Sequence, residues 1–288
     1  MVRGSERDHR CNRAKTFLFT DIEGSTLRWD AGGATAKLRG PEQNSSNYGD
    51  PMATLRVGAA FPDPPFNGMP DNAGLDIDLM TAIAGVLGAT VEFIGYEGRD
   101  FNGIFDALNS GDYDCVAAGT TVTPERETKA AFVAPYLISG QSLAVDTSRL
   151  PNVRSTDDIE GLTIGVQQGN TSQPIADRLV AAGKAARVRV YDYGAIRVAL
   201  TDLTTGACDV FMKLAPVLIE LVKPVAGVEV VQRGLSVENI AIAVPLDDQG
   251  LLRHIADAQE ELEQQGALQR IRRKWLGNPY TDQSLAVH

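Results

Sequence analysis

Cysteine and histidine are scarce in this sequence of 288 residues, which contains three of each. Cys11, Cys115 and Cys208 lie far apart, and no CxxC pair or flanking histidine gives them the spacing of metal ligands. We interpret these cysteines as small buried apolar residues. The sequence therefore predicts neither a metal site nor a bound cofactor.

Long hydrophobic runs are also absent, because no stretch approaches the roughly 18 apolar residues that a membrane-spanning helix needs. We expect no membrane span. The basic residues 1–15 are followed only by TFLF before Asp21, whereas a secretory signal has an apolar core of about 7–15 residues. We therefore expect no export signal at this N-terminus.

Positive charge is limited, since the formal net charge is −10 and basic residues cluster only at Arg272, Arg273 and Lys274. Binding to nucleic acid requires clustered Lys and Arg that neutralise phosphates. These three residues are instead expected to end a helix, where cations are favourable. The chain is not predicted to bind nucleic acid.

Residues 31–53 are rich in Gly, Ala, Ser, Asn and Pro and follow no period of 2 or 3.6, which indicates a linker. We predict that residues 1–53 are an N-terminal extension and linker with little order. The globular part is expected to start near Thr54.

From Thr54 onward, short apolar strands alternate with amphipathic helices. Strands are expected at residues 55–59, 90–94, 115–119, 142–145, 162–166, 188–192, 208–212 and 240–244. Helices are expected at residues 74–87, 101–108, 171–182, 194–204, 249–265 and 267–275. Such a pattern predicts an α/β fold, in which helices cover both faces of parallel sheets and the same architecture occurs twice.

The stretch GTTVTPER, residues 119–126, predicts an anion-binding turn at the carboxyl edge of a strand. Pro124 suits the first turn of a helix, and free N–H groups and Thr hydroxyls would face a ligand there. Arg126 adds a planar fork that grips a carboxylate with two hydrogen bonds. The alternative is a surface ion pair between Arg126 and Glu125 or Glu127.

Long stretches of the chain resemble family 3 of the solute-binding proteins of ABC importers, the group that binds polar amino acids. The resemblance covers residues 54–277 and is carried by LRVGAAFPDPPF, GLDIDLMTAIAGVLG, AAGTTVTPERE, FVAPYLISGQSLAV, GLTIGVQQGNT and EQQGALQRIRRKWLG. It implies a two-lobed periplasmic-binding-protein-like fold of type II, with the ligand held in the cleft between two lobes joined by two crossing strands. Lobe 1 would be residues 54–140 plus 241–288, and lobe 2 residues 143–238.

The resemblance also implies a function and partners. The chain would be a monomer that captures a small carboxylate-bearing solute, an amino acid or a related organic acid, and delivers it to an ABC transporter permease. Members of the family are exported, so an extracytoplasmic location is expected from the fold, whereas the N-terminus as written implies a cytoplasmic one. In the latter case the chain would be a cytoplasmic solute sensor.

Five site residues follow from this resemblance by position. Arg126, Thr121 and Gly119 match the residues that hold the ligand's α-carboxylate. Thr171, in QQGNT, matches a second carboxylate-binding hydroxyl, although capping of the following helix by Thr171 or Asn170 is an equally open interpretation. Phe101 matches a residue that packs against the ligand side chain, and it is equally compatible with a core position.

The sequence departs from the family where the ligand's α-ammonium is held. The family's Asp follows eight residues after the Gly before DA, and here that position is Leu214, with Lys213 beside it. A buried ammonium without a partner costs several kcal/mol. Asp63, in the loop FPDPPF, is a candidate replacement if it faces the cleft, but it is also a typical turn residue. Lys213 is either a cleft cation or a solvated lysine at the rim.

Two enzymatic functions were weighed against binding. A lyase similar to cyclohexadienyl dehydratase would need a tuned acid or base in the cleft, for which Lys213 and Asp63 are the candidates. Residues 16–30, containing FLFTDIEGST, resemble the start of a class III nucleotide cyclase domain, in which the residue matching Asp21 binds a metal. The rest of that domain is missing from the sequence, so no catalytic residue is assigned and the chain is not expected to be an enzyme.

Overall fold

The computed structural model describes residues 19–20, 26–27, 54–68 and 72–277. The chain divides into two units, Met1–Ser45 and Ser46–His288. In the first unit, β1 (Phe19–Thr20) pairs antiparallel with β2 (Thr26–Leu27). Asp21 lies outside the described residues, so its predicted resemblance to a metal-binding residue stays untested.

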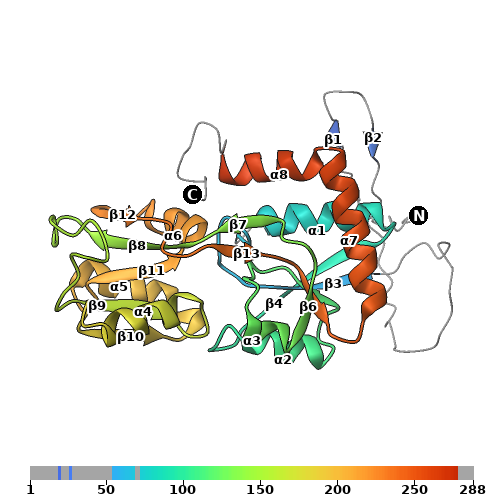
Figure 1. Ribbon diagram of the computed structural model, residues 1–288. Helices are drawn as coiled ribbons and strands as arrows, with labels where there is room; N and C mark the ends of the chain where they lie inside the picture. The colour runs from blue at the N-terminus through green and yellow to red at the C-terminus, as the bar shows by residue number, and fades with distance from the viewer. Residues whose placement is uncertain (1–18, 21–25, 28–53, 69–71, 278–288) are drawn as a thin grey trace, which may run out of the picture. The chain divides into compact units, whose positions relative to one another are not determined.

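The second unit contains two separate five-stranded sheets, which define its two lobes (Figure 1). In the first lobe the strand order is β4-β3-β5-β14-β6. Its strands are β3 (Thr54–Ala59), β4 (Thr90–Gly95), β5 (Cys115–Val116), β6 (Ala130–Phe132) and β14 (Ala243–Pro245). The strands β3, β4 and β5 are parallel, whereas β14 runs antiparallel to β5 and β6. The parallel arrangement predicted for the first three strands is therefore confirmed, and β14 adds antiparallel pairing because it re-enters the first lobe after the chain has passed through the second.

Helices cover both faces of the first sheet, as predicted. The lobe contains α1 (Leu75–Val86), α2 (Gly103–Asn109), α3 (Pro124–Glu127), α7 (Gln249–Gln264) and α8 (Ala267–Leu276). Apolar side chains of α1, α7 and α8 share a core with Cys115, and those of α2 share another core with Val116. Neighbouring strand residues point to opposite faces, so these two residues belong to different cores.

In the second lobe the strand order is β10-β9-β11-β8-β12. Its strands are β8 (Gln141–Asp146), β9 (Thr163–Gln167), β10 (Arg187–Tyr191), β11 (Val210–Leu214) and β12 (Val228–Gln232). Its helices are α4 (Ser172–Ala181), the 3-10 turn η1 (Tyr193–Ala195), α5 (Ile196–Thr205) and α6 (Ala215–Val222). α4 packs on one face of the sheet, and α5 and α6 pack on the other. The two-lobed α/β fold is confirmed, although α6 and β12 were not predicted.

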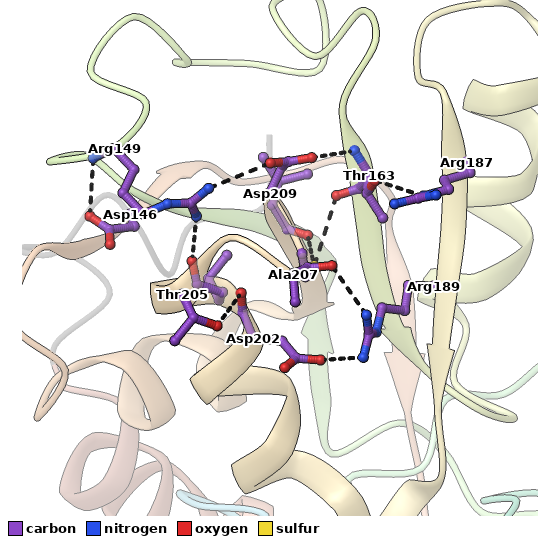
Figure 2. Close-up of polar contacts among 12 residues, drawn as sticks. Asp146, Arg149, Thr163, Arg187, Arg189, Asp202, Thr205, Ala207 and Asp209 are labelled. Carbon is purple, nitrogen blue, oxygen red and sulfur yellow. Dashed lines mark hydrogen bonds and ion pairs between the residues drawn. The ribbon is translucent and has the colours of Figure 1, made fainter.

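Charged side chains in the second lobe pair with one another around the end of α5 (Figure 2). Arg149 lies 3.7 Å from a carboxylate oxygen of Asp209 and donates to the carbonyl of Leu203 at the end of α5. Arg189, on β10, pairs with Asp202 of α5 at 2.6 Å. These contacts hold α5 against β10 and against the segment that follows β8, so we interpret the cluster as structural.

Two strand predictions near the cleft are corrected. Strand β11 was expected at residues 208–212 but begins two residues later, because Gly206 ends α5 with φ +87° and Cys208 N–H bonds back to Asp202. Lys213 and Leu214 are therefore strand residues. The strand expected at 115–119 ends at Val116, and Gly119 has φ +57°, which favours glycine.

Two short strands connect the lobes (Figure 1). β7 (Leu137–Ser139) pairs antiparallel with β13 (Glu238–Ile240), and this ribbon is separate from both sheets. The strand expected at 240–244 is thus two strands, since β13 belongs to the ribbon and β14 to the first sheet. The lobe boundaries inferred from the sequence lie at this ribbon and stay a prediction.

Candidate ligand-binding site

One pocket lies between the two lobes and brings together residues from both. Its lining residues are Asp63, Phe101, Ala118, Gly119, Thr121, Arg126, Gln141, Asn170, Thr171, Lys213, Leu214 and Val217. All eight site residues expected from the sequence are among them. The cavity has a volume of about 30 Å³, which is room for about two water molecules. In this structure, protein side chains therefore fill most of the space between the lobes.

Arg126 is held at the start of the short helix α3. Thr123 caps this helix, since its hydroxyl accepts from the backbone N–H of Arg126, and Pro124 stands in the first turn. The Arg126 side chain is only 4% exposed. The alternative of a surface ion pair is therefore wrong, because the guanidinium points into the pocket region rather than into solvent.

The Arg126 guanidinium makes hydrogen bonds to both lobes. Nε donates to Asn102 Oδ1 at 3.1 Å and Nη1 to the Thr121 carbonyl at 2.9 Å, and Nη2 reaches the Gly169 carbonyl of the second lobe at 3.0 Å. Its charge lies 4.9 Å from the ring centre of Phe101. Burial lowers the pKa of Arg126 to about 10, which leaves the side chain charged at neutral pH. A guanidinium has five N–H donors, so two remain for a ligand.

The hydroxyls of Thr121 and Thr171 meet on one carboxylate that the sequence did not indicate. Both donate to Oε2 of Glu238, at 2.6 and 2.8 Å, and Ser236 donates to Oε1 at 2.7 Å. Glu238 lies on β13 and is 6% exposed. The two hydroxyls expected to bind a ligand carboxylate thus both bind a carboxylate of the protein itself in this structure, and their role toward a ligand stays a prediction.

Thr171 stands at the N-cap position of α4, but its side chain makes no capping hydrogen bond. The capping alternative is therefore wrong for this threonine. Its hydroxyl instead donates to Glu238 and accepts from Gln141 Nε2 at 3.0 Å. Thr171 consequently links the start of α4 to the connecting strand β13 and to the first residue of β8.

Gly119 lines the pocket, but its N–H is directed away from it, toward Asp76. The distance from Gly119 N to Asp76 Oδ2 is 2.7 Å, and Asp76 also accepts from Asn67 and from the hydroxyl of Tyr136. Burial raises the pKa of Asp76 to about 6. The prediction of a free N–H at Gly119 is corrected, because this donor holds the turn in place. The signal in the sequence was an acid inside the apolar stretch GLDIDL.

Asp63 and Lys213 form an ion pair across the cleft. Lys213 Nζ lies 3.1 Å from Asp63 Oδ1, and the two side chains are 3% and 11% exposed. Tyr193 donates its hydroxyl to Asp63 Oδ2 at 3.1 Å, while Lys213 also donates to Gln167 Oε1 at 2.7 Å. Asp63 therefore faces the cleft, and the alternative of a solvated rim lysine is wrong for Lys213. The positive charge expected in the cleft is balanced by Asp63.

Phe101 and Leu214 form the apolar part of the pocket. Phe101 is 4% exposed, and its ring centre lies 5.2 Å from that of Tyr193 of the second lobe. It belongs to the core around α2, as one interpretation expects, and it also lines the pocket; packing of Phe101 against a ligand side chain stays a prediction. Leu214 is 8% exposed and lies directly opposite Gln141 in the ladder between β11 and β8.

The part of the chain that the structure describes contains no group of three or more His, Cys, Asp or Glu side chains that would hold a metal ion. Cys115 and Cys208 are buried free thiols, as predicted. Among the described residues, no helix is both long and apolar enough to cross a lipid bilayer.

Comparison with known proteins gives a consistent result. The family described as "Bacterial extracellular solute-binding proteins, family 3" matches residues 55–278. A probable histidine-binding protein of Campylobacter jejuni is 34% identical over 155 residues, a match that spans 52% of this chain and 59% of that relative. An ancestral arginine-binding protein, solved with arginine bound, is 36% identical, with a TM-score of 0.70 over 78% of this chain and 98% of that one. The ancestral amino-acid-binding protein AncCDT-1, described as a precursor of cyclohexadienyl dehydratase, is 30% identical, with a TM-score of 0.68 over 77% and 95% of the two chains.

Proposed function

Since the chain belongs to family 3 of the bacterial extracellular solute-binding proteins, we propose that it captures an amino acid between its lobes and delivers it to an ABC transporter permease. The observation that carries this proposal is the convergence of Arg126, Thr121 and Thr171 on one pocket from two lobes. The relatives named for histidine, arginine and amino-acid binding support the same class of ligand.

Charge in and beside the pocket favours a ligand of zero net charge. The cations of Arg126 and Lys213 are matched by the carboxylates of Asp63 and Glu238, and all four residues are buried. A net charge on the ligand would be uncompensated in this buried environment, where an unpaired ion costs several kcal/mol. We therefore propose an amino acid with a neutral side chain.

Ligand entry requires the lobes to separate. The remaining cavity of about 30 Å³ is too small for an amino acid, and the hydrogen bond from Arg126 to Gly169 and the pair Asp63–Lys213 both cross the cleft. Hinge motion at the ribbon of β7 and β13 would break these contacts and admit the ligand. When the lobes close again, the two remaining N–H donors of Arg126 would hold the carboxylate of the ligand.

The description of the family as extracellular supports a location outside the cytoplasm. We also propose that the protein acts as a monomer. The mature protein would be exported and would meet its permease at the membrane surface. N-terminal sequencing of the native protein tests this part of the proposal, since an intact residue 1–53 segment on a cytoplasmic protein contradicts it.

A second candidate function is a dehydratase-like lyase, because AncCDT-1, itself an amino-acid-binding protein, is described as a precursor of cyclohexadienyl dehydratase. Its acid or base would be Asp63 or Lys213, and each is engaged by the other in a buried ion pair. Chemistry therefore needs that pair to separate first. Product formation from a carboxylated ring substrate, lost in Lys213→Ala, would favour this function over binding alone.

Ligand binding is tested by thermal shift and titration calorimetry against the twenty L-amino acids and a set of organic acids. A ligand present at a hundred times its Kd stabilises the folded state by about 2.7 kcal/mol. Arg126→Met should weaken binding by about 100-fold or more, because charged hydrogen bonds to the carboxylate are lost.

The matched control is Arg56→Met. Arg56 is also an arginine of the first lobe and pairs with Asp114 at 2.6 Å, but it does not line the pocket. This variant should keep the affinity of the original protein. A folded protein that binds none of the amino acids overturns the proposal, whether or not it binds an organic acid.

A further inference from the structure

Gln141, the first residue of β8, is a pocket-lining residue that carries a buried acceptor without a partner among the described residues. The side chain is 2% exposed and lines the cavity. Its Nε2 donates to Thr171 Oγ1 at 3.0 Å, whereas Oε1 has no hydrogen-bond partner among the described residues. A buried acceptor left without a donor costs free energy, so a ligand that supplies a donor would be favoured.

The orientation of this amide is fixed by the hydrogen bonds around it. The single hydroxyl proton of Thr171 goes to Glu238 Oε2, so Thr171 Oγ1 is left only as an acceptor toward Gln141. A reversed amide would place an oxygen against that oxygen. The Gln141 nitrogen therefore belongs at Thr171, and the oxygen is the atom without a partner.

The position of this oxygen distinguishes it from other buried atoms of the same kind. Five buried side-chain atoms in the described part of the chain have no partner, and they belong to Asn67, Thr120, Gln141, Ser172 and Gln259. Of these residues, Gln141 is the one that lines the pocket. An unpaired acceptor at this place points to a ligand rather than to a packing defect.

Gln141 also lies next to the position where the family resemblance predicts an aspartate. Leu214 and Gln141 are opposite each other in the antiparallel ladder of β11 and β8, so their side chains lie on the same face at neighbouring positions. The carboxylate of Asp63, which faces the cleft, is already paired with Lys213. The amide oxygen of Gln141 is thus an acceptor without a partner among the described residues, on the residue directly opposite Leu214 in the ladder.

We propose that Gln141 Oε1 accepts a hydrogen bond from the α-ammonium of the bound amino acid and so takes over the role of the aspartate that Leu214 replaces. This inference rests on the proposed function. An amide carries no net charge, so its bond to the ammonium is weaker than that of a carboxylate, and it adds no negative charge to a pocket whose charges already balance. Gln141 is then the residue that selects an amino acid over the corresponding acid without an amino group.

Titration calorimetry tests this selection with two ligands. They are the tightest-binding of the twenty L-amino acids and the same carboxylic acid without its amino group. The original protein should prefer the amino acid by about 10- to 100-fold, the worth of one hydrogen bond to a charged group. Gln141→Leu should remove most of this preference by weakening the amino acid alone.

Two further variants make the result specific. Gln259→Leu is the matched control, because Gln259 is also a buried glutamine whose Oε1 has no partner, but it lies on α7 away from the pocket. It should leave the preference unchanged. The double variant Gln141→Leu with Leu214→Asp should regain it, because a carboxylate then faces the ammonium.

The outcomes separate the two proposals. If none of the amino acids binds, the proposed function fails. If an amino acid binds and Gln141→Leu weakens both ligands equally, Gln141 acts only by supporting Thr171 and the inference is overturned. An unchanged preference in Gln141→Leu also overturns it.

Discussion

The ion pair between Asp63 and Lys213 leads to a prediction about the closed cleft. Substitution Lys213→Met keeps the length of the side chain and removes its charge. Asp63 would then keep only the hydroxyl of Tyr193 as a side-chain partner in the cleft, at 3.1 Å. The substitution removes the ion pair between Lys213 Nζ and Asp63 Oδ1 at 3.1 Å. It also removes, within the second lobe, the hydrogen bond from Lys213 to Gln167.

The magnitude follows from burial. Lys213 and Asp63 are 3% and 11% exposed, so the remaining carboxylate of Asp63 would be nearly buried without a counter-ion. Removing one member of a buried pair costs about 3–5 kcal/mol. Because the pair joins two lobes, the protein can reduce this cost by opening and hydrating Asp63. The closed state should therefore be destabilised by about 3–5 kcal/mol, and part of this should appear as opening.

The assay combines urea unfolding with small-angle X-ray scattering of the protein without added ligand. Lys213→Met should unfold at lower urea concentration and show a larger radius of gyration. The double variant Asp63→Asn with Lys213→Met should recover most of both properties, since no unpaired charge remains. A single variant with unchanged scattering and an unfolding free energy within about 1 kcal/mol of the original would refute the reasoning.

Two further predictions concern Asp76 and Gly169. Burial raises the pKa of Asp76 from 3.8 to about 6. Between these two pH values the folded state therefore binds more protons than the unfolded state. The free energy of unfolding should fall by about 3 kcal/mol as the pH rises through this window. Asp76→Asn should lack this fall in urea unfolding measured at pH 4 and pH 7, and an identical pH profile contradicts the assignment. Gly169 has φ +77°, and a Cβ there would lie 2.0 Å from Asp100 Oδ1 and 2.8 Å from Phe101 N of the first lobe. Gly169→Ala should therefore weaken ligand binding about tenfold or more, because the added methyl group hinders closure of the lobes. The far-UV circular dichroism spectrum should stay unchanged. Full affinity in calorimetry would show that closure tolerates the methyl group.

The regular parts of the fold could be predicted because local patterns set them. The apolar strand at residues 54–59 and the helix at 75–86 lie within a residue or two of the predicted positions. The errors lie where the chain leaves a sheet. The split of the strand predicted at 240–244 depends on pairing with β7 in one half and with β5 and β6 in the other, and neither pairing is visible in the local sequence.

Glu238 and Gln141 illustrate what the sequence did not reveal about the site. Neither was assigned a role from the sequence, and each is brought to the site by a hydrogen bond to the hydroxyl of Thr171. Thr171 is 67 residues from Glu238 and 30 from Gln141 along the chain. These contacts exist because β13 and the first residue of β8 both lie against the start of α4 in the folded chain.

The sequence by itself determined the two-lobed α/β fold, the family and eight of the twelve residues that line the pocket, because these depend on periodicity and on motifs contained in short segments. Only the tertiary structure decided how those residues are used. It pairs Lys213 with Asp63, directs the Gly119 N–H to Asp76 and leaves the Gln141 oxygen without a partner. Each of these outcomes depends on the distance between atoms far apart in sequence, which only the packing of the folded chain sets.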